Sequence, residues 1–208
     1  MESRRITVLS AGLGVPSSSR LLADQLAASA EQQLAAAGYA VTVDLVELRD
    51  LAVEIANNFV TGYAPPRLAE VIAGVEASDG IIAVSPVFSA SYSGLFKSFI
   101  DVLDPKSLDG KAVLLGATGG TDRHQMVLDY AMRPLFTYLR ARIAATGVFA
   151  GPQDWGTASD GGAPLSARIE RAAGEFTRLL QDARPRQRQA PLESLPFEQL
   201  LAGITGAK

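Results

Sequence analysis

Short apolar runs alternate with longer segments of helical period along this chain. Runs rich in Val and Ile are typical of β-strands, and five are present, at residues 5–10, 40–46, 80–85, 112–118 and 142–149. The segments between them carry apolar residues along one stripe, which predicts helices over residues 18–37, 66–77, 94–103, 123–140 and 165–183. Strict alternation of strands and helices is the pattern of βαβ units, so we predict an α/β fold with a parallel sheet.

The third run, residues 80–85, is apolar on both faces, as expected for a strand that helices cover on either side. The common five-strand solution for a doubly wound sheet is the flavodoxin-like order 2-1-3-4-5, with helices on both faces. We predict this fold for one domain over residues 1–183. Residues 184–208 begin with Arg and Pro and close with Leu and Phe. We expect this extension to dock on its own or a neighbouring subunit, because an undocked apolar tail would be an exposed patch.

Charge and composition remove several classes of function. The chain has 208 residues, with 19 Lys and Arg against 22 Asp and Glu. A net charge of −3 argues against nucleic acid and anionic membranes as partners. Without cysteine and with His124 as the single histidine, the chain offers no thiolate or histidine-rich metal site. The apolar run at residues 6–9 is too short for a signal peptide or a membrane span, which predicts a cytoplasmic protein.

In a doubly wound sheet, ligands bind beyond the carboxyl ends of the strands at the switch point. The loop after the first predicted strand, residues 10–20, has neither the Lys of a P-loop nor the third Gly of a dinucleotide fingerprint. It offers Ser17, Ser18, Ser19 and Arg20 at a helix start, where free N–H groups and hydroxyls suit a terminal phosphate monoester. The simpler alternative is that Ser17 is only an N-cap, but three consecutive serines exceed what a cap needs.

Two further loops reach the same edge. After the third strand, Pro86 restricts the backbone and Gly94 frees it, and small residues between them leave main-chain groups accessible to a flat polar ring. Phe88 and Tyr92 would flank such a ring, and the alternative is a turn with two core aromatics. After the fourth strand, the paired glycines of residues 118–121 allow close approach to a ligand. We interpret His124 as a solvated first-turn residue rather than a catalyst.

No catalytic side chain can be assigned from these residues. No pair of carboxylates stands out as acid and base, and the Gly-x-Ser-x-Gly motif is absent. The pattern indicates a site that holds a ligand whose own chemistry does the work, as in a cofactor enzyme or carrier.

Three spaced motifs carry a resemblance to a known family over about residues 4–183. They are SPVFSASYSGLFK at residues 85–97, ATGGT at 117–121 and DYAMRPL at 129–135. The chain resembles the NADPH-dependent FMN reductases that supply reduced flavin to two-component alkanesulfonate-type monooxygenases. The subgroup that it resembles pairs with luciferase-like monooxygenases.

This resemblance implies FMN at the switch point, hydride transfer from NADPH or NADH to flavin N5, and a homodimer or homotetramer. Residues that occupy the family's positions would then bind the cofactor in three groups. Ser17, Ser18, Ser19 and Arg20 would hold the phosphate, Pro86, Val87 and Phe88 would border the isoalloxazine, and Thr118, Gly119, Gly120 and Thr121 would contact its pyrimidine side. Ser10, Ser85 and Tyr92 complete the expected set.

Pro134 lies well inside the fourth predicted helix. It removes a donor to the carbonyl of Tyr130 and clashes with it, which predicts a kink or a π-type bulge there. The resemblance implies a π-helix at Tyr130 on a subunit interface. The alternative is a simple proline kink with Tyr130 in the core.

The leading hypothesis is therefore an NAD(P)H-dependent flavin reductase that supplies reduced FMN to a partner monooxygenase. One alternative is a quinone, azo or metal reductase with tightly bound FMN, which would purify yellow. Another is a non-catalytic electron carrier like flavodoxin, although carriers of this fold are usually more acidic than −3. A third is an assembly or sensor protein that has kept the fold without the activity.

Overall fold

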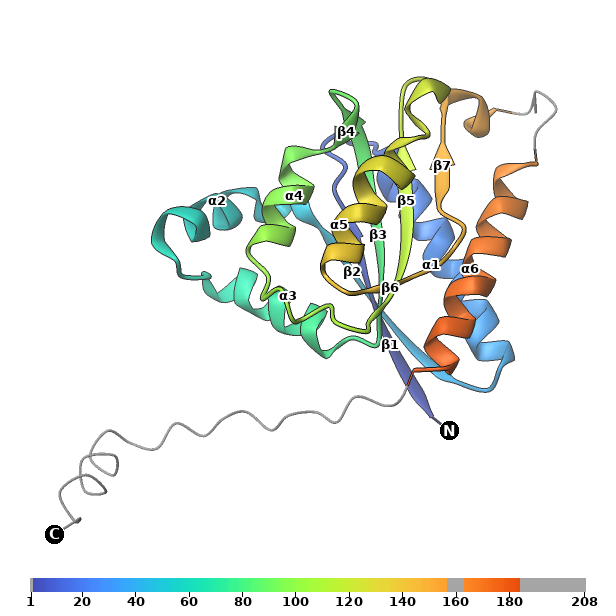
Figure 1. The fold of residues 1–208 in the computed structure, drawn as a ribbon, viewed down its shortest axis with the longest axis horizontal. Helices are drawn as coiled ribbons and strands as arrows, with labels where there is room; N and C mark the ends of the chain where they lie inside the picture. Colours follow the sequence, from blue (N-terminus) through green and yellow to red (C-terminus); the bar gives the residue numbers. More distant parts are fainter. Residues whose placement is uncertain (1, 157–162, 184–208) are drawn as a thin grey trace, which may run out of the picture.

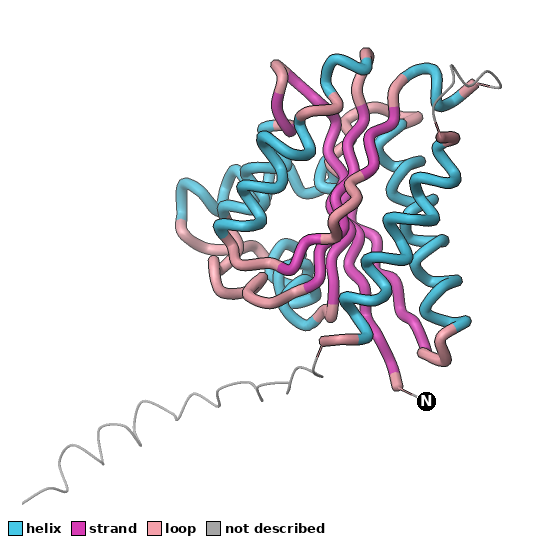
Figure 2. The backbone as a smooth tube through the Cα atoms, turned by 45° about the vertical axis from the view of Figure 1, so that its right-hand side comes forward, coloured by secondary structure: helices cyan, strands magenta, loops and turns pink. Residues whose placement is uncertain are grey.

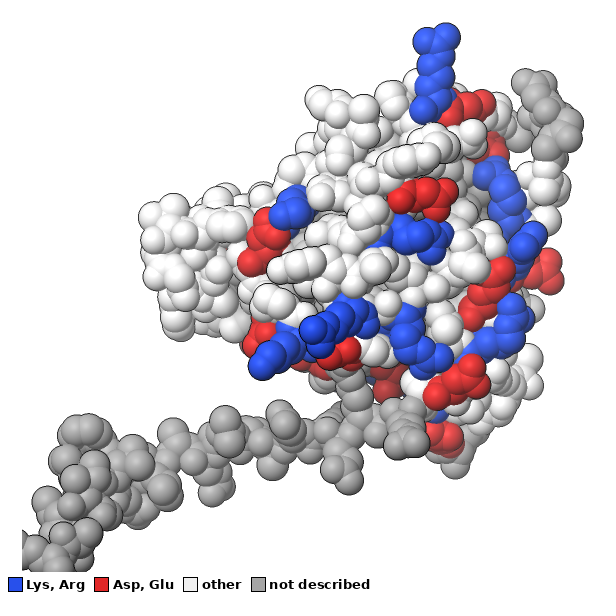
Figure 3. All heavy atoms as spheres, in the orientation of Figure 1, with Lys and Arg blue, Asp and Glu red and all other residues white. Residues whose placement is uncertain are grey.

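The computed structural model describes residues 2–156 and 163–183, and the predicted extension at 184–208 lies outside the described residues. Figure 1 shows a central twisted sheet with helices on both sides. No described helix is long and apolar enough to cross a membrane. On the face shown in Figure 3, basic and acidic side chains are interspersed rather than gathered by sign.

The sheet has the predicted strand order. Its main path, β2-β1-β3-β5-β6, is parallel throughout and corresponds to the order 2-1-3-4-5 of the five predicted runs. Two short strands lie off this main path. Strand β4 pairs antiparallel with β3, and β7 pairs parallel with β5. The strands are β1 Ser3–Ser10, β2 Ala40–Glu47, β3 Gly80–Phe88, β4 Ser91–Tyr92, β5 Ala112–Thr118, β6 Arg142–Ile143 and β7 Val148–Ala150.

Helices cover both faces, as Figure 2 shows. One face carries α1 Ser18–Ala36 and α6 Leu165–Gln181. The other carries α2 Ala52–Thr61, α3 Pro66–Ala77, α4 Gly94–Asp101 and α5 Arg133–Tyr138. Short 3-10 helices complete the described chain, at η1 Leu48–Leu51, η2 Asp122–His124 and η4 Pro152–Trp155.

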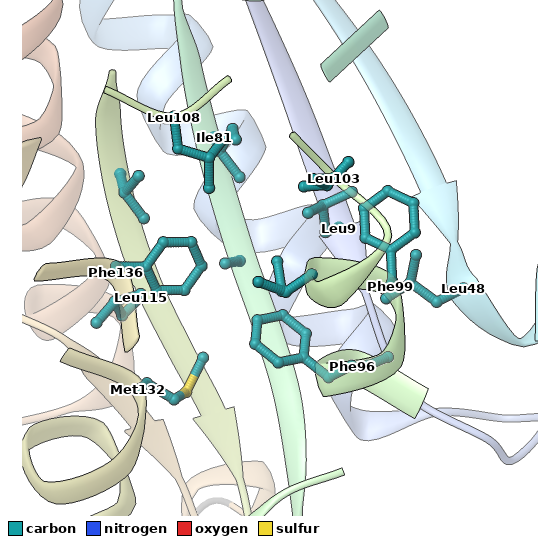
Figure 4. Close-up of a cluster of buried hydrophobic side chains, with 14 of the residues drawn as sticks. Leu9, Leu48, Ile81, Phe96, Phe99, Leu103, Leu108, Leu115, Met132 and Phe136 are labelled. Atoms are coloured by element: carbon teal, nitrogen blue, oxygen red, sulfur yellow. The ribbon is translucent and has the colours of Figure 1, made fainter. Parts of the chain in front are cut away.

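The sheet separates two hydrophobic clusters, and β3 contributes to both by alternation. Ile81 and Ala83 enter the cluster under α2 to α5, which we call the α4 cluster, whereas Ile82 and Val84 enter the cluster under α1 and α6, the α1 cluster. Figure 4 shows part of the α4 cluster, in which aromatic rings from α4 and α5 meet above the sheet. The ring centroids of Phe96 and Phe136 are 6.2 Å apart.

The segment before α5 contains the π-type turn that Pro134 predicts. Residues Leu128–Met132 form the π-helix η3, and the N–H of Arg133 donates to the carbonyl of Leu128, five residues earlier. Pro134 follows in the first turn of α5, where its missing N–H costs no intrahelical bond. Tyr130 is 75% exposed, so the alternative that buries it in the core is wrong.

Glu175 of α6 holds the connection between β6 and β7. Its carboxylate accepts hydrogen bonds from the Thr146 N–H at 2.6 Å and from Thr146 Oγ1 at 2.8 Å. Burial alone raises the pKa of Glu175, but these bonds, together with Arg171, outweigh it and leave the pKa below its ordinary value of 4.5. The charged form is therefore the one that the folded chain favours.

The Glu175→Gln variant should be less stable than the wild type by about 1 kcal/mol at neutral pH, because it loses a charged acceptor. A carboxylate with a lowered folded-state pKa contributes stability above its unfolded-state pKa and loses it as the pH falls through the folded-state value. The difference between the two proteins should thus shrink as the pH falls below 4.5 and disappear once the pH is below the folded-state pKa of Glu175. Urea unfolding at several pH values measures it, and a difference independent of pH would contradict this role.

Candidate functional site

A cleft of about 530 Å³ opens at the carboxyl ends of the parallel strands, which is the upper edge of the sheet in Figure 1. Its walls come from the loops after β1, β3, β5 and β7. This is the switch point at which the sequence places a ligand. The lining residues are Gly12, Leu13, Gly14, Pro16, Ser17, Ser18, Ser19, Pro86, Val87, Phe88, Thr118, Gly119, Gly120, Ala150, Pro152 and Trp155.

The loop after β1 folds tightly against the start of α1. Ser17 is the N-cap of α1, and its Oγ accepts from the N–H of Arg20 at 3.2 Å. A Cβ on Gly12 would lie 1.9 Å from that Oγ, so any larger residue there would displace the capping hydroxyl. Ser17 is thus a cap, as the simpler alternative holds, but it also lines the cleft beside Ser18 and Ser19. The site therefore has hydroxyls and free N–H groups at the positive end of a helix dipole.

Ser19 connects this loop to the end of β5. Its Oγ lies 2.7 Å from Thr118 Oγ1, and both side chains are buried. Beyond Thr118, the N–H of Gly119 donates to the carbonyl of Ala150 at 3.2 Å. A Cβ on Gly119 would lie 2.9 Å from the Phe149 ring, so close packing against β7 requires glycine at this position. The cleft floor is therefore held by contacts that join the start of α1, the end of β5 and the end of β7.

Arg20 lies outside the cleft lining. Its guanidinium Nε is 2.9 Å from Asp24 Oδ1, and its Nη1 is 3.7 Å from Glu47 Oε2. The hydrogen bond to Asp24 is the main cause that raises the pKa of Arg20, with Glu47 acting in the same direction. Two carboxylates therefore already compensate this charge.

The segment after Pro86 continues as strand and forms a hairpin with β4. Phe88 pairs with Ser91, which leaves Ser89 and Ala90 as a two-residue turn with φ of 50° and 64°. Positive φ at both positions is the geometry of a type I′ hairpin, which continues the twist of the strands. The hairpin holds Phe88 at the cleft, where it is 45% exposed.

Several predicted residues support the cleft from outside its lining. Ser85 Oγ is buried, accepts from the N–H of Ser93 at 2.9 Å and donates to the carbonyl of Pro86. The Tyr92 ring packs on Phe96, with centroids 5.8 Å apart. For Tyr92, the alternative of an aromatic residue packed on the core therefore holds. Ser10 is buried beneath the loop and Thr121 caps η2. Of the fourteen predicted residues, those outside the lining are Ser10, Arg20, Ser85, Tyr92 and Thr121.

The sequence marks the long turn-rich loop that begins at Gly151 as one that tends to be functional, but none of its residues was assigned to the site. Ala150 at the end of β7 and Pro152 and Trp155 of η4 also line the cleft. The available signal was the single tryptophan of the chain, placed in a turn-rich loop directly after the last strand. His124 is half-buried on η2. Within residues 2–156 and 163–183, no cluster of three or more His, Cys, Asp or Glu is arranged to hold a metal ion.

Fold and cleft together define a flavodoxin-like protein that binds a ligand at the switch point of its sheet. The donor set fits the phosphate of FMN, because a dianion is held well by hydroxyls and by N–H groups at a helix start. The apolar side chains of Val87 and Phe88 fit a flat ring system. The residues present therefore match both ends of such a molecule.

Comparison with known proteins identifies the family. The profile of the family described as NADPH-dependent FMN reductase matches residues 4–156. An FMN reductase (NADPH) of Pseudomonas aeruginosa is 35% identical over 81% of this chain and 88% of its own length. The NADH-dependent FMN reductase SfnF of Pseudomonas fluorescens is 33% identical over the same shares. A solved oxidoreductase from Corynebacterium diphtheriae has a TM-score of 0.84 and 41% identity, covering 88% of this chain and 100% of its own.

The chain therefore belongs to the NADPH-dependent FMN reductase family. Membership in this family makes it an NAD(P)H:FMN oxidoreductase, so the predicted class of enzyme and the predicted FMN and nicotinamide nucleotides are confirmed.

Proposed function

We propose that this protein oxidises NADPH or NADH, reduces FMN at the described cleft and passes the reduced flavin to a flavin-dependent monooxygenase. The cleft carries the proposal, because it combines a hydroxyl-lined helix start with apolar walls. When bound, FMN supplies a ring that accepts a hydride from the reduced nicotinamide and a proton from water. The protein contributes position and exclusion of water.

Different lining residues of the cleft bind the phosphate and the ring of FMN. Ser17, Ser18 and Ser19, with the free N–H groups of the first turn of α1, bind the phosphate. Val87 and Phe88 hold one side of the ring and keep water from it, and Gly119 and Gly120 let the main chain approach. Because the nicotinamide supplies the hydride, no side chain here has to act as nucleophile or general base.

An assay of NADPH and NADH oxidation by the purified protein, with and without added FMN, tests the activity. We expect oxidation to rise with FMN concentration and to saturate. A protein that uses FMN as a substrate should purify nearly colourless and should support a flavin-dependent monooxygenase placed behind a dialysis membrane. No flavin-dependent oxidation with either nucleotide would contradict the reductase function, and a yellow protein that never releases flavin would contradict the supply role.

The phosphate role of the α1 loop has its own test. Ser18 is exposed in the cleft and has no structural hydrogen bond among those found in the described chain, so Ser18→Ala should fold normally. We expect its dissociation constant for FMN to rise about tenfold, because one charge-assisted hydrogen bond is lost. Riboflavin, which lacks the phosphate, should bind both proteins equally. Equal weakening for the two flavins would show that Ser18 does not contact the phosphate.

The proposal extends to assembly and location. Tyr130 of η3 and Tyr138 of α5 are 75% and 81% exposed in consecutive helical elements, which supports a homodimer or homotetramer with the Tyr130 helix at the interface. Large exposed aromatic side chains are typical of such interfaces. Light scattering on the purified chain should give twice or four times its mass of 21.9 kDa, and a monomer at every concentration would contradict the assembly. We place the protein in the cytoplasm, where its nucleotide substrates are present.

A further inference from the structure

The wall formed by η4 is held by an ion pair from a neighbouring helix. Asp154 Oδ2 accepts from the N–H of Gly151 at 2.8 Å, and its other oxygen pairs with the guanidinium of Arg168 on α6. The Asp154 side chain is 12% exposed and that of Arg168 is 31% exposed. A partly buried pair of this kind has one well-defined geometry, because the guanidinium is planar and its donors are arranged as a fork.

Arg168 binds more than Asp154. Its Nη1 donates to the carbonyl of Phe149 in β7 at 2.5 Å, and its Nε donates to the carbonyl of Ala163 at 3.1 Å. One side chain of α6 therefore holds the end of β7, the η4 turn and the chain that enters α6. On the other side of η4, the Gln153 amide donates to the carboxylate of Asp122 in η2. The turn is anchored from two directions.

The position of Trp155 relative to the two hydrophobic clusters shows which end of the cleft it borders. Trp155 packs against the α1 cluster, on the side of the sheet that carries α1 and α6. The first turn of α1, with Ser18 and Ser19, lies on that same side. Val87 packs against the α4 cluster, on the opposite side. Trp155 therefore borders the end of the cleft that holds the α1 hydroxyls, away from Val87.

We propose that Trp155 and Pro152, held in place by the Arg168–Asp154 ion pair, make the cleft selective for a flavin mononucleotide over a flavin dinucleotide. This rests on the proposed function, in which the α1 loop binds the flavin phosphate. A mononucleotide ends at that phosphate, whereas a dinucleotide continues into a second phosphate and an adenosine. An anchored indole on the α1 side of the cleft would meet this second half. Selectivity of this kind comes from excluding the larger ligand rather than from binding the smaller one more tightly.

The direct test compares FMN and FAD in Trp155→Ala. Dissociation constants are measured for both by flavin fluorescence, alongside NADPH oxidation with each flavin. The ratio of the FAD to the FMN dissociation constant should fall about tenfold, mainly through tighter FAD binding. Trp155→Phe, which keeps an aromatic wall, should retain most of the selectivity. If Trp155→Ala does not fold, Trp155→Leu poses the same question with a smaller loss of packing.

The anchoring role of Arg168 has a readout that does not depend on activity. Trp155 is the only tryptophan, so its fluorescence reports on this turn alone. Arg168→Ala should make Trp155 more accessible to acrylamide quenching and should lower the selectivity for FMN. Arg171→Ala, on the same helix with a side chain that is 76% exposed, should change neither. A change in thermal stability without a change in quenching or selectivity would mean that Arg168 only stabilises the fold.

The outcomes separate this inference from the proposed function. A wild-type protein that reduces FMN, with Trp155 variants whose ratio of FAD to FMN affinity is unchanged, overturns the selectivity and leaves the reductase function standing. A wild-type protein that oxidises no nicotinamide nucleotide with FMN overturns the proposed function itself. A wild-type protein that binds FAD as tightly as FMN also overturns the selectivity, whatever the variants do.

Discussion

Replacing Gly12 with alanine should weaken FMN binding about 100-fold. The new Cβ would lie 1.9 Å from Ser17 Oγ and 3.2 Å from Ser19 Cβ, so the Ser17 hydroxyl must turn away and the Ser19 side chain must shift. Ser17 would have to leave its capping position, and the Ser19 contact with Thr118 would shift as well. Both changes fall on residues that present hydroxyls to the cleft, so FMN binding should suffer far more than folding.

Stability should fall by only about 1 kcal/mol in Gly12→Ala, the usual effect of losing an N-cap. Flavin fluorescence titration measures the binding and urea unfolding measures the stability. Gly74→Ala is the matched control, because a Cβ on Gly74 in α3 would meet no atom within 4 Å. It should leave the FMN dissociation constant unchanged. An FMN affinity in Gly12→Ala within about threefold of the wild type would show that the loop tolerates a different path.

Replacing Lys111 with methionine should destabilise the protein by about 3 kcal/mol. Lys111 is 2% exposed, and its ammonium donates to the carbonyls of Val75 at 2.6 Å, Ser78 at 2.7 Å and Glu76 at 3.0 Å. Two of these carbonyls belong to the last turn of α3, whose dipole favours a cation there. Methionine keeps the apolar stem but leaves buried acceptors without their donor.

Urea unfolding gives the magnitude for Lys111→Met. Lys106→Met, at an exposed position nearby in the sequence, is the control and should change stability by less than about 0.5 kcal/mol. Flavin binding should be retained in the folded fraction of both proteins, because Lys111 lies at the start of β5 and the cleft lies at its end. A loss below about 1 kcal/mol would show that water reaches the freed carbonyls.

Apolar runs predicted the central strands, because β3 and β5 are buried on both faces and stand out as uninterrupted apolar segments. The sheet order followed from the common solution for five alternating strands and helices. The predicted run at residues 142–149 is divided into β6 and β7. Gly147 lies where a Cβ would be 3.2 Å from Leu128, and the segment before it bends to meet Glu175. Such a break depends on tertiary contacts that no periodicity shows.

The helix α2 was not predicted. It buries only Ile55, and its large apolar residues Val53, Phe59 and Val60 are exposed. Strict alternation of strand and helix left room for a single helix between the runs at 40–46 and 80–85, and α3 takes that place. The predicted helix 123–140 is three elements, namely η2, the π-helix and α5, and only Pro134 gave a sign of this. The π-type turn could be predicted from Pro134 because a proline disturbs the hydrogen bonds of its own helix, whatever the helix packs against.

For the site, the loops after β1, β3 and β5 could be found because topology places them at one edge and their residue types are unusual. The sequence does not show which of their side chains enter the cleft. Ser85 and Ser18 look alike in sequence, but Ser85 faces the backbone of Ser93 whereas Ser18 faces the cleft. Trp155 was missed because its place depends on the ion pair with α6, which joins residues 14 positions apart.

The contacts of the Arg168 guanidinium determine where the length of this chain can change. It holds Asp154 on one side of residues 157–162 and Ala163 on the other. Insertions or deletions between these two anchor points would change the length of the chain without moving either η4 or the start of α6. Natural length variation among descendants of this protein should therefore accumulate between Gly156 and Ala163, while the ligand preference set by Trp155 is inherited unchanged.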